Sequence, residues 1–110
     1  MKEKIKYEDF EKLDLKIATI KTVENHPNAN KLYVLTIDLG DETRQIVAGM
    51  KPYYKPEEMI GKQIVVIANL EAAKLRGIES NGMLLAADDG KGKVILLTVD
   101  KKIENGAEIR

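Results

Sequence analysis

The chain has 110 residues with 18 basic and 18 acidic side chains, so its formal net charge is zero. This length predicts one domain with a modest core, and neutrality argues against a general nucleic-acid coat protein. The sequence has no cysteine, which excludes disulfides and makes a reducing cytoplasm the expected compartment. Its apolar runs are too short for a membrane span, and the mixed charges of residues 1–4 do not resemble a signal peptide.

Basic side chains are concentrated in the middle of this neutral chain. Residues 44–76 hold six basic and three acidic side chains, a local net charge of +3, whereas the other segments are balanced or acidic. A local patch of this kind recruits phosphates while the whole molecule stays neutral.

The first half of the chain predicts one short helix and a bent strand. Residues 5–13 have the apolar spacing of a short amphipathic helix. Residues 13–23 predict one long strand, in which the apolar alternation changes phase at Ala18 and Ile20. A phase change within a strand predicts a bulge that bends it.

A hairpin is expected next, and then five further segments. The turn His26–Asn30 leads to an alternating strand over residues 33–39, and Gly40-Asp41 turns the chain into a strand over residues 43–48. Further along the chain we expect, in order, a short helical turn after Pro56, buried strands over residues 64–68 and 83–87, a polar turn over residues 88–93 and a sixth strand over residues 94–99.

This order of elements is that of an OB-fold, a five-stranded Greek-key barrel. We therefore predict an all-β single domain over residues 1–110, with the barrel over about 13–87 and a C-terminal extension over 88–110. Ligands of OB-folds cross strands two and three between two loops. Here those loops are His26–Lys31 and Asn69–Gly82.

The second of these loops carries a cationic motif. Lys74 and Arg76 are two residues apart, so an extended chain would place both on one side. Gly77 and Gly82 allow unusual backbone conformations or close approach of a partner. The pattern favours a polyanion as ligand; the alternative is a tight connection with two solvated cations.

No residue pattern in the chain indicates catalysis. His26 is the only histidine and there is no cysteine, so no metal cluster and no cofactor is predicted; a histidine before proline in a turn is usually solvated or capping. Ser80 has no histidine near it in sequence, and a nucleophile needs a base. The acidic pairs Glu57-Glu58 and Asp88-Asp89 are expected to be solvated. The sequence therefore predicts a binding module rather than an enzyme.

Two tyrosines lie between two lysines in a second candidate binding segment. Tyr53-Tyr54 is flanked by Lys51 and Lys55, and aromatic rings interleaved with cations bind single-stranded bases. In the alternative interpretation, one ring fills the barrel end and the other lies on the surface. Arg44 begins the third expected strand, where it either crosses the binding face or is a solvated hairpin arginine.

Four segments together resemble a known family. They are His26–Leu32, Arg44–Gly49, Tyr53–Glu58 and the stretch from Ala68-Asn69-Leu70 through Ser80–Ala87. They resemble the tRNA-binding domain of methionyl-tRNA synthetase C-terminal domains or beta subunits, of free-standing structure-specific tRNA-binding proteins and of endothelial monocyte-activating polypeptide II-like domains. The likeness covers nearly all of the chain, with departures at Asn30, often Asp in the family, and near Ala72, often Pro.

The resemblance implies a non-catalytic OB-fold that binds tRNA by shape, near the outer corner of the L. It also implies a homodimer, and it allows a methionyl-tRNA synthetase catalytic chain as partner. The alternative is a chaperone-like dimer that binds proteins and not tRNA. The expected tRNA-binding residues are Lys31, Arg44, Lys51, Tyr53, Lys55, Lys74, Arg76, Ser80 and Met83.

The expected sixth strand bears on assembly. Its apolar run does not alternate with polar residues as a strand with one solvated face would, so both faces are expected to be covered. A second copy of the chain is the simplest cover. The expected dimer interface comprises Val94, Leu96 and Val99.

Overall fold

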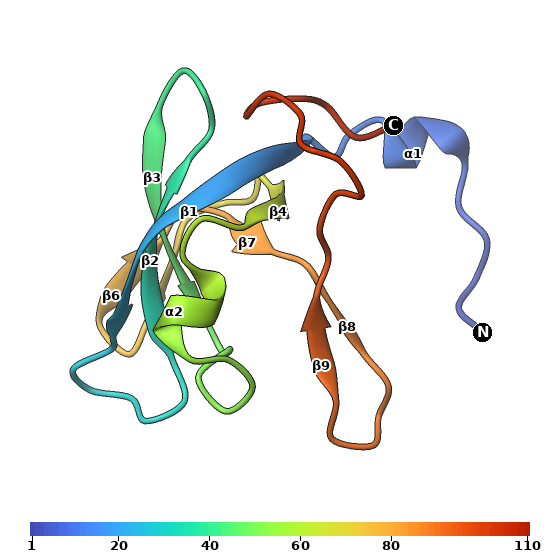
Figure 1. Ribbon diagram of the computed structural model, residues 1–110. Coiled ribbons are helices and arrows are strands. Elements are labelled where there is room, and N and C mark those ends of the chain that lie inside the picture. Colours follow the sequence, from blue (N-terminus) through green and yellow to red (C-terminus); the bar gives the residue numbers. More distant parts are fainter.

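Five antiparallel strands form one curled sheet in the order β3-β2-β1-β4-β7, as the computed structural model of residues 1–110 shows (Figure 1). The strands are β1 (Leu15–Asn25), β2 (Tyr33–Asp38), β3 (Thr43–Ala48), β4 (Gln63–Ile67) and β7 (Met83–Leu84). The sheet is a nearly closed barrel in which a meander of three strands is followed by a fourth that returns to the first. This arrangement confirms the predicted OB-type barrel.

Two short hairpins and two short helices complete the chain. One hairpin pairs β5 (Ala73–Leu75) with β6 (Ile78–Ser80), and the other pairs β8 (Ala86–Asp88) with β9 (Val94–Leu96). The helices are α1 (Tyr7–Phe10) and α2 (Pro56–Met59). Pro56 occupies the first turn of α2, where its fixed φ suits a helix start.

The barrel interior is filled by aliphatic side chains from alternate strand positions. In β2, Tyr33, Leu35 and Ile37 are buried and the residues between them are partly exposed. Met59 of α2 is fully buried and belongs to the same core cluster. Each fully buried aliphatic side chain contributes about 1.5–3 kcal/mol relative to exposure, so the core fixes the register of the strands.

A bulge lets β1 serve two partners. The register of β1 against β2 shifts between Ile20 and Thr22, which leaves Lys21 unpaired. A bulge within β1 is thus confirmed, but it lies beyond the predicted phase change at Ala18, where β1 pairs with β4 without interruption. The first half of β1 pairs with β4 and the second half with β2. The C-terminal segment also pairs with the start of β1, because the Ile17 N–H donates to the Ala107 carbonyl at 3.0 Å.

The N-terminal helix is much shorter than the predicted range of residues 5–13. It covers only Tyr7–Phe10 and buries none of its residues. The residues before it extend away from the barrel (Figure 1). A helix of one turn without a buried face has little to stabilise it, which explains why the apolar spacing alone overstated its length.

The prediction of a single buried strand over residues 83–87 was wrong. The chain divides at Leu85, so that β7 pairs with β4 and β8 pairs with β9. The Leu85 N–H donates to Val65 and the Leu85 carbonyl accepts from the Leu97 N–H, at 3.0 and 3.2 Å. Leu85 therefore bonds to both sheets at the point where the chain leaves one for the other.

The expected sixth strand is confirmed only over Val94–Leu96, and its faces differ. Leu96 is buried in the barrel core of its own chain, and Val94 packs against that core. Ile95 is 52% exposed and Leu97 is 39% exposed. The run therefore alternates between a buried and an exposed face, and within one chain only the first face is covered.

Candidate nucleic-acid interface

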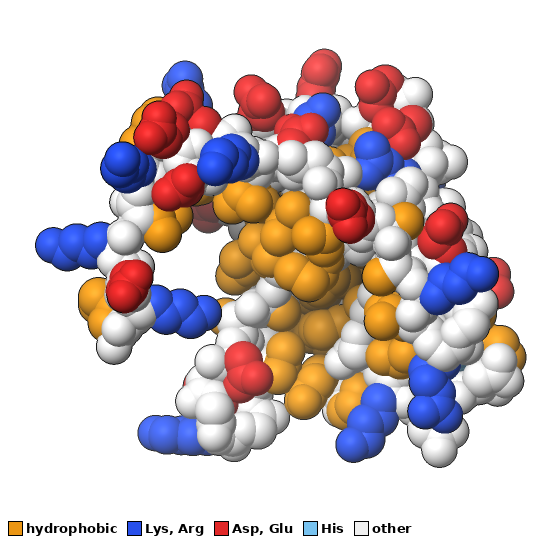
Figure 2. All heavy atoms as spheres, turned by 180° about the vertical axis from the view of Figure 1, so that it is seen from behind, with side chains coloured by type: hydrophobic (Ala, Val, Ile, Leu, Met, Phe, Trp, Pro, Cys, Tyr) orange, Lys and Arg blue, Asp and Glu red, His pale blue; other side chains and the backbone are white.

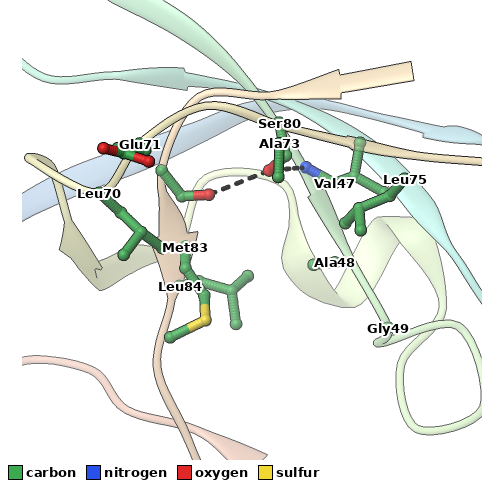
Figure 3. Close-up of a pocket in the computed structure, with 11 residues that line it drawn as sticks. Val47, Ala48, Gly49, Leu70, Glu71, Ala73, Leu75, Ser80, Met83 and Leu84 are labelled. Atoms are coloured by element: carbon green, nitrogen blue, oxygen red, sulfur yellow. Dashed lines mark hydrogen bonds between the residues drawn. The ribbon is translucent and has the colours of Figure 1, made fainter. Parts of the chain in front are cut away.

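A serine hydroxyl joins β3 to the segment between β6 and β7. The Val47 N–H donates to Ser80 Oγ at 2.9 Å, and Ser80 Oγ donates to the Gly82 carbonyl at 2.9 Å (Figure 3). Gln45 adds two bonds. Its side-chain Nε2 donates to the Glu79 carbonyl, and its backbone carbonyl accepts from the Asn81 N–H, both at 2.9 Å. These bonds close the barrel where no continuous strand ladder does.

The hydroxyl of Ser80, an expected tRNA-binding residue, is therefore engaged within the protein. Its side chain is buried, with the residue only 5% exposed, and its hydroxyl uses both its donor and an acceptor position. The small size of the serine side chain lets the hydroxyl stand in for a backbone partner of β3.

The predicted loop Asn69–Gly82 contains the β5–β6 hairpin instead. Its two-residue turn is Arg76-Gly77, and both residues have positive φ, 54° and 91°, as type I′ turns require. Arg76 is the only residue other than glycine with positive φ. Because Arg76 lies in the turn and not in an extended strand, strand alternation does not place it on the same side as Lys74.

The loop between β1 and β2 is bonded to this hairpin. His26 Nε2 lies 2.8 Å from the Leu75 carbonyl oxygen, and Arg76 Nη2 donates to the Asn28 carbonyl at 3.3 Å. The His26 N–H also donates to the Leu32 carbonyl at 3.1 Å, which closes the loop on itself. The two segments expected to flank the ligand are thus joined to each other.

Five of the predicted cations are exposed on the surface. They are Lys31, Lys51, Lys55, Lys74 and Arg76. None of them takes part in an ion pair, because the three ion pairs of the chain are Lys12–Asp9, Lys16–Asp14 and Arg44–Glu42. Their charges are therefore available to a polyanion.

Arg44, by contrast, is engaged within the protein. Its Nε donates to Glu42 at 2.7 Å and its Nη1 donates to the Ala68 carbonyl at 2.5 Å. The hydrogen bond from Arg44 holds the pKa of Glu42 below its ordinary value, and the same bond raises the pKa of Arg44. Its guanidinium thus ties β3 to the residue that follows β4.

The two adjacent tyrosines have different roles. The Tyr54 hydroxyl accepts from the Leu96 N–H at 3.0 Å, and the Tyr54 carbonyl accepts from the buried Tyr33 hydroxyl at 2.7 Å. Burial raises the pKa of Tyr33, and Glu57 and Glu58 add to that rise. Tyr53 is 44% exposed. Tyr54 therefore packs against the core, and Tyr53 lies on the surface.

Tyr53 lies with two of the exposed lysines in a shallow depression. Lys51, Pro52, Tyr53 and Lys55 line it together with Tyr33, Tyr54 and Glu58. This depression shares no lining residue with the pocket beside the β5–β6 hairpin. The predicted site residues therefore form two groups, one at the hairpin and one before α2.

An apolar pocket of about 320 Å³ lies between β3, the β5–β6 hairpin and β7. Leu70, Leu75 and Met83 are among its lining residues (Figure 3). Figure 2 shows hydrophobic side chains gathered in a hollow of the face opposite to that of Figure 1, with charged side chains around it. Met83, an expected tRNA-binding residue, lines the apolar pocket and is 44% exposed.

Sequence reasoning missed the polar residues that assemble the site. His26, Asn28 and Gln45 all form contacts to the hairpin from distant positions. The dipeptide Arg76-Gly77 between Leu75 and Ile78 was the available signal for the hairpin, because two-residue turns of this kind favour glycine second.

No group of three or more His, Cys, Asp or Glu side chains is arranged to hold a metal ion. Neither α1 nor α2 has the length or the hydropathy of a membrane-spanning helix.

Residues 15–108 match the family described as "Putative tRNA binding domain". The chain belongs to this family. It is 58% identical over 108 residues to a methionine–tRNA ligase of Thermococcus kodakarensis and 51% identical over 108 residues to that of Methanocaldococcus jannaschii. The matches cover 98% of this chain but only 14% and 17% of those proteins. The chain thus spans about one-sixth or less of these relatives.

Solved structures agree with this membership of the tRNA-binding-domain family. A MetRS-related protein from Pyrococcus horikoshii matches with a TM-score of 0.93 at 35% identity, covering 99% of this chain and all of that one. The chaperone CsaA from Bacillus anthracis matches with a TM-score of 0.91 at 32% identity, covering 98% of this chain and all of that one.

We predict that Ser80→Ala destabilises the protein. The substitution leaves the Val47 N–H without a partner at the closing bonds of the barrel, and an unpaired buried donor costs about 1–3 kcal/mol. Urea unfolding followed by circular dichroism measures this loss. Asn81→Ala, at the neighbouring exposed position, is the control and should stay within about 0.5 kcal/mol. Equal stability of Ser80→Ala and the parent would contradict the role of the hydroxyl.

Proposed function

We propose that this chain is a non-catalytic, structure-specific tRNA-binding protein that recognises the outer corner of the tRNA L. The observation that carries the proposal is the bonding of the hairpin with Lys74 and Arg76 to the loop with Lys31, at His26 and Asn28. The two segments that carry these cations are thereby joined, and none of the three cations has an ion-pair partner. Fixed cations suit a folded RNA, whose phosphates have a defined spacing.

The chain further supports a role beside a synthetase in the cytoplasm. Its relatives named methionine–tRNA ligase contain the matching region as a small part of their length. We propose that the chain acts as a beta subunit or detached C-terminal domain for a methionyl-tRNA synthetase catalytic chain. A pull-down with the tagged chain from nuclease-treated lysate tests this: recovery of the synthetase supports it, and its absence favours a free-standing tRNA-binding protein.

Salt dependence is the first prediction of the tRNA-binding proposal. With about three to five phosphate contacts, the slope of log affinity against log salt should lie between roughly −2 and −4.5. Fluorescence anisotropy with labelled tRNA over a salt series measures it. An unstructured RNA of equal length should bind more weakly, because shape is recognised. A flat salt series contradicts the electrostatic interpretation, and equal binding of both RNAs contradicts shape recognition.

The second prediction concerns the hairpin cation. Arg76→Asn should weaken tRNA binding about five- to tenfold, since a charge-assisted phosphate contact contributes roughly 1–1.4 kcal/mol. Asparagine tolerates positive φ, so the turn is kept while the charge is lost, which alanine would not achieve. Lys91→Ala, in the turn of the β8–β9 hairpin, is the matched control. If both variants bind like the parent, the hairpin is not the site.

A chaperone-like function is the second candidate, and the apolar pocket is the observation that favours it. The pocket volume of about 320 Å³ and its Leu70 and Met83 walls suit an aliphatic side chain of a bound protein. The similarity to a chaperone structure points the same way. Two results together would favour this alternative. The parent would bind folded tRNA no better than unstructured RNA, and an apolar peptide would shift the methyl NMR signals of Leu70 and Met83.

We also propose that the protein is a homodimer that pairs through β9 and the residues that follow it. The exposed side chains available for this contact are Ile95 and Leu97. Val99 is half-buried in the same segment, whereas Leu96 faces the core. A second copy would cover apolar surface that one chain leaves in water. Burial of such surface contributes a favourable free energy of about 25 cal/mol per Å².

Ile95→Asp should therefore shift the protein toward monomer and leave its fold intact. The substitution places a charge on an exposed position that the proposed interface buries. Leu96→Asp is the contrasting variant, expected to unfold the barrel because it buries a charge in the core. Sedimentation velocity with circular dichroism separates the two effects. A monomeric parent at micromolar concentration would rule out the dimer.

A further inference from the structure

His26 is a buried residue whose two ring nitrogens are both engaged. The residue is only 4% exposed. The Asn28 N–H donates to Nδ1 at 3.0 Å, and Nε2 lies 2.8 Å from the Leu75 carbonyl oxygen. A backbone N–H only donates and a carbonyl only accepts, so both bonds form together only when the ring is neutral and carries its proton on Nε2.

Each of these bonds has a separate structural effect. The Nδ1 bond is local, since it joins residues two apart and fixes the turn after β1. The Nε2 bond is distant, since it joins the loop between β1 and β2 to the last residue of β5, 49 positions along the chain. Arg76, the next residue after Leu75, makes the other contact to the same loop, through Asn28.

The hairpin needs this support because it is small. β5 and β6 have three residues each and form a sheet of their own. A two-stranded hairpin is marginally stable alone in water. The bonds from Gln45 and Val47 hold its base at residues 79–81, whereas His26 and Asn28 hold it beside the turn.

We propose that His26 is a positioning residue for RNA binding, which fixes the hairpin cations Lys74 and Arg76 against the loop that carries Lys31. The inference rests on the proposed tRNA-binding function. It assigns His26 no contact with RNA, because the ring is buried and both its nitrogens are occupied. We call the bond between His26 Nε2 and the Leu75 carbonyl the latch. Without the latch, the hairpin cations move independently of the loop, and tRNA binding loses the preorganised spacing of its phosphate contacts.

Two substitutions separate the local bond from the distant one. In His26→Asn, the short amide reaches the place of Nδ1 and accepts from Asn28, but it does not reach the Leu75 carbonyl. In His26→Gln, the longer amide reaches the place of Nε2 and donates to that carbonyl, but it offers nothing to Asn28. We expect tRNA affinity to fall in the order parent, His26→Gln, His26→Asn, with at least a fivefold gap between the two variants.

A double-mutant cycle distinguishes positioning from a general loss of stability. If His26 acts by placing Arg76, the affinity losses of His26→Asn and Arg76→Asn are not multiplicative, and the double variant binds nearly as well as the weaker single one. Multiplicative losses would overturn the proposal, as would equal tRNA affinity of the two His26 variants.

A measurement without RNA keeps the latch testable even if tRNA binding itself fails. Amide hydrogen exchange of residues 75–78 should be faster in His26→Asn than in His26→Gln, because only the first loses the bond to the hairpin. The nitrogen chemical shifts of the parent ring should show a protonated Nε2 and an unprotonated Nδ1. Equal exchange, or a proton on Nδ1, overturns the latch; a parent that does not bind tRNA refutes the proposed function instead.

Discussion

The closing contact of the barrel determines where the candidate site lies. β3 and the segment after β6 do not share a continuous ladder, and the hydroxyl of Ser80 bridges them. Gly82 is part of the same contact: with φ of 124°, a side chain there would approach the Ile67 carbonyl oxygen at 3.1 Å. A barrel closed by a few bonds, most of them from side chains, leaves space beside the joint, and the apolar pocket occupies that space.

The hairpin's position follows from this closing contact. β6 ends at Ser80, so the bonds that close the barrel also anchor the base of the hairpin. The turn at Arg76-Gly77 lies beyond the reach of those bonds and is held by the β1–β2 loop. Two separate sets of contacts, one from β3 and one from that loop, therefore determine where the hairpin cations lie.

The strands of the barrel are well predicted because alternation and turn residues are patterns of neighbouring residues in the sequence. Alternation in β2 and the Gly40-Asp41 turn indicate a hairpin directly, and the observed β2–β3 pairing follows. The division at Leu85 is not predictable from hydropathy, because two strands in different sheets form one apolar run. The contacts of the site were missed for a different reason: His26 and Leu75 are 49 residues apart, and no local pattern reports such a bond.

Sequence alone also does not tell which of the predicted cations are free to bind a ligand, because that depends on contacts between distant residues. Charge alone does not separate Arg44 from Arg76. One is bonded to Glu42 and the Ala68 carbonyl, whereas the other has no ion pair. Their difference lies in tertiary partners, which composition does not encode.

The backbone conformation of Arg76 distinguishes it further from Arg44. A left-handed conformation costs a residue with a side chain roughly 1–2 kcal/mol, and glycine would avoid that cost at this turn. Its single bond to Asn28, at 3.3 Å to a neutral carbonyl, contributes no more than about 0.5–1.5 kcal/mol. The bond and the conformational cost are therefore of similar size, so the bond gives the arginine little net stability at this turn. An exposed cation at the tip of this hairpin is what the proposed binding of a polyanion would use.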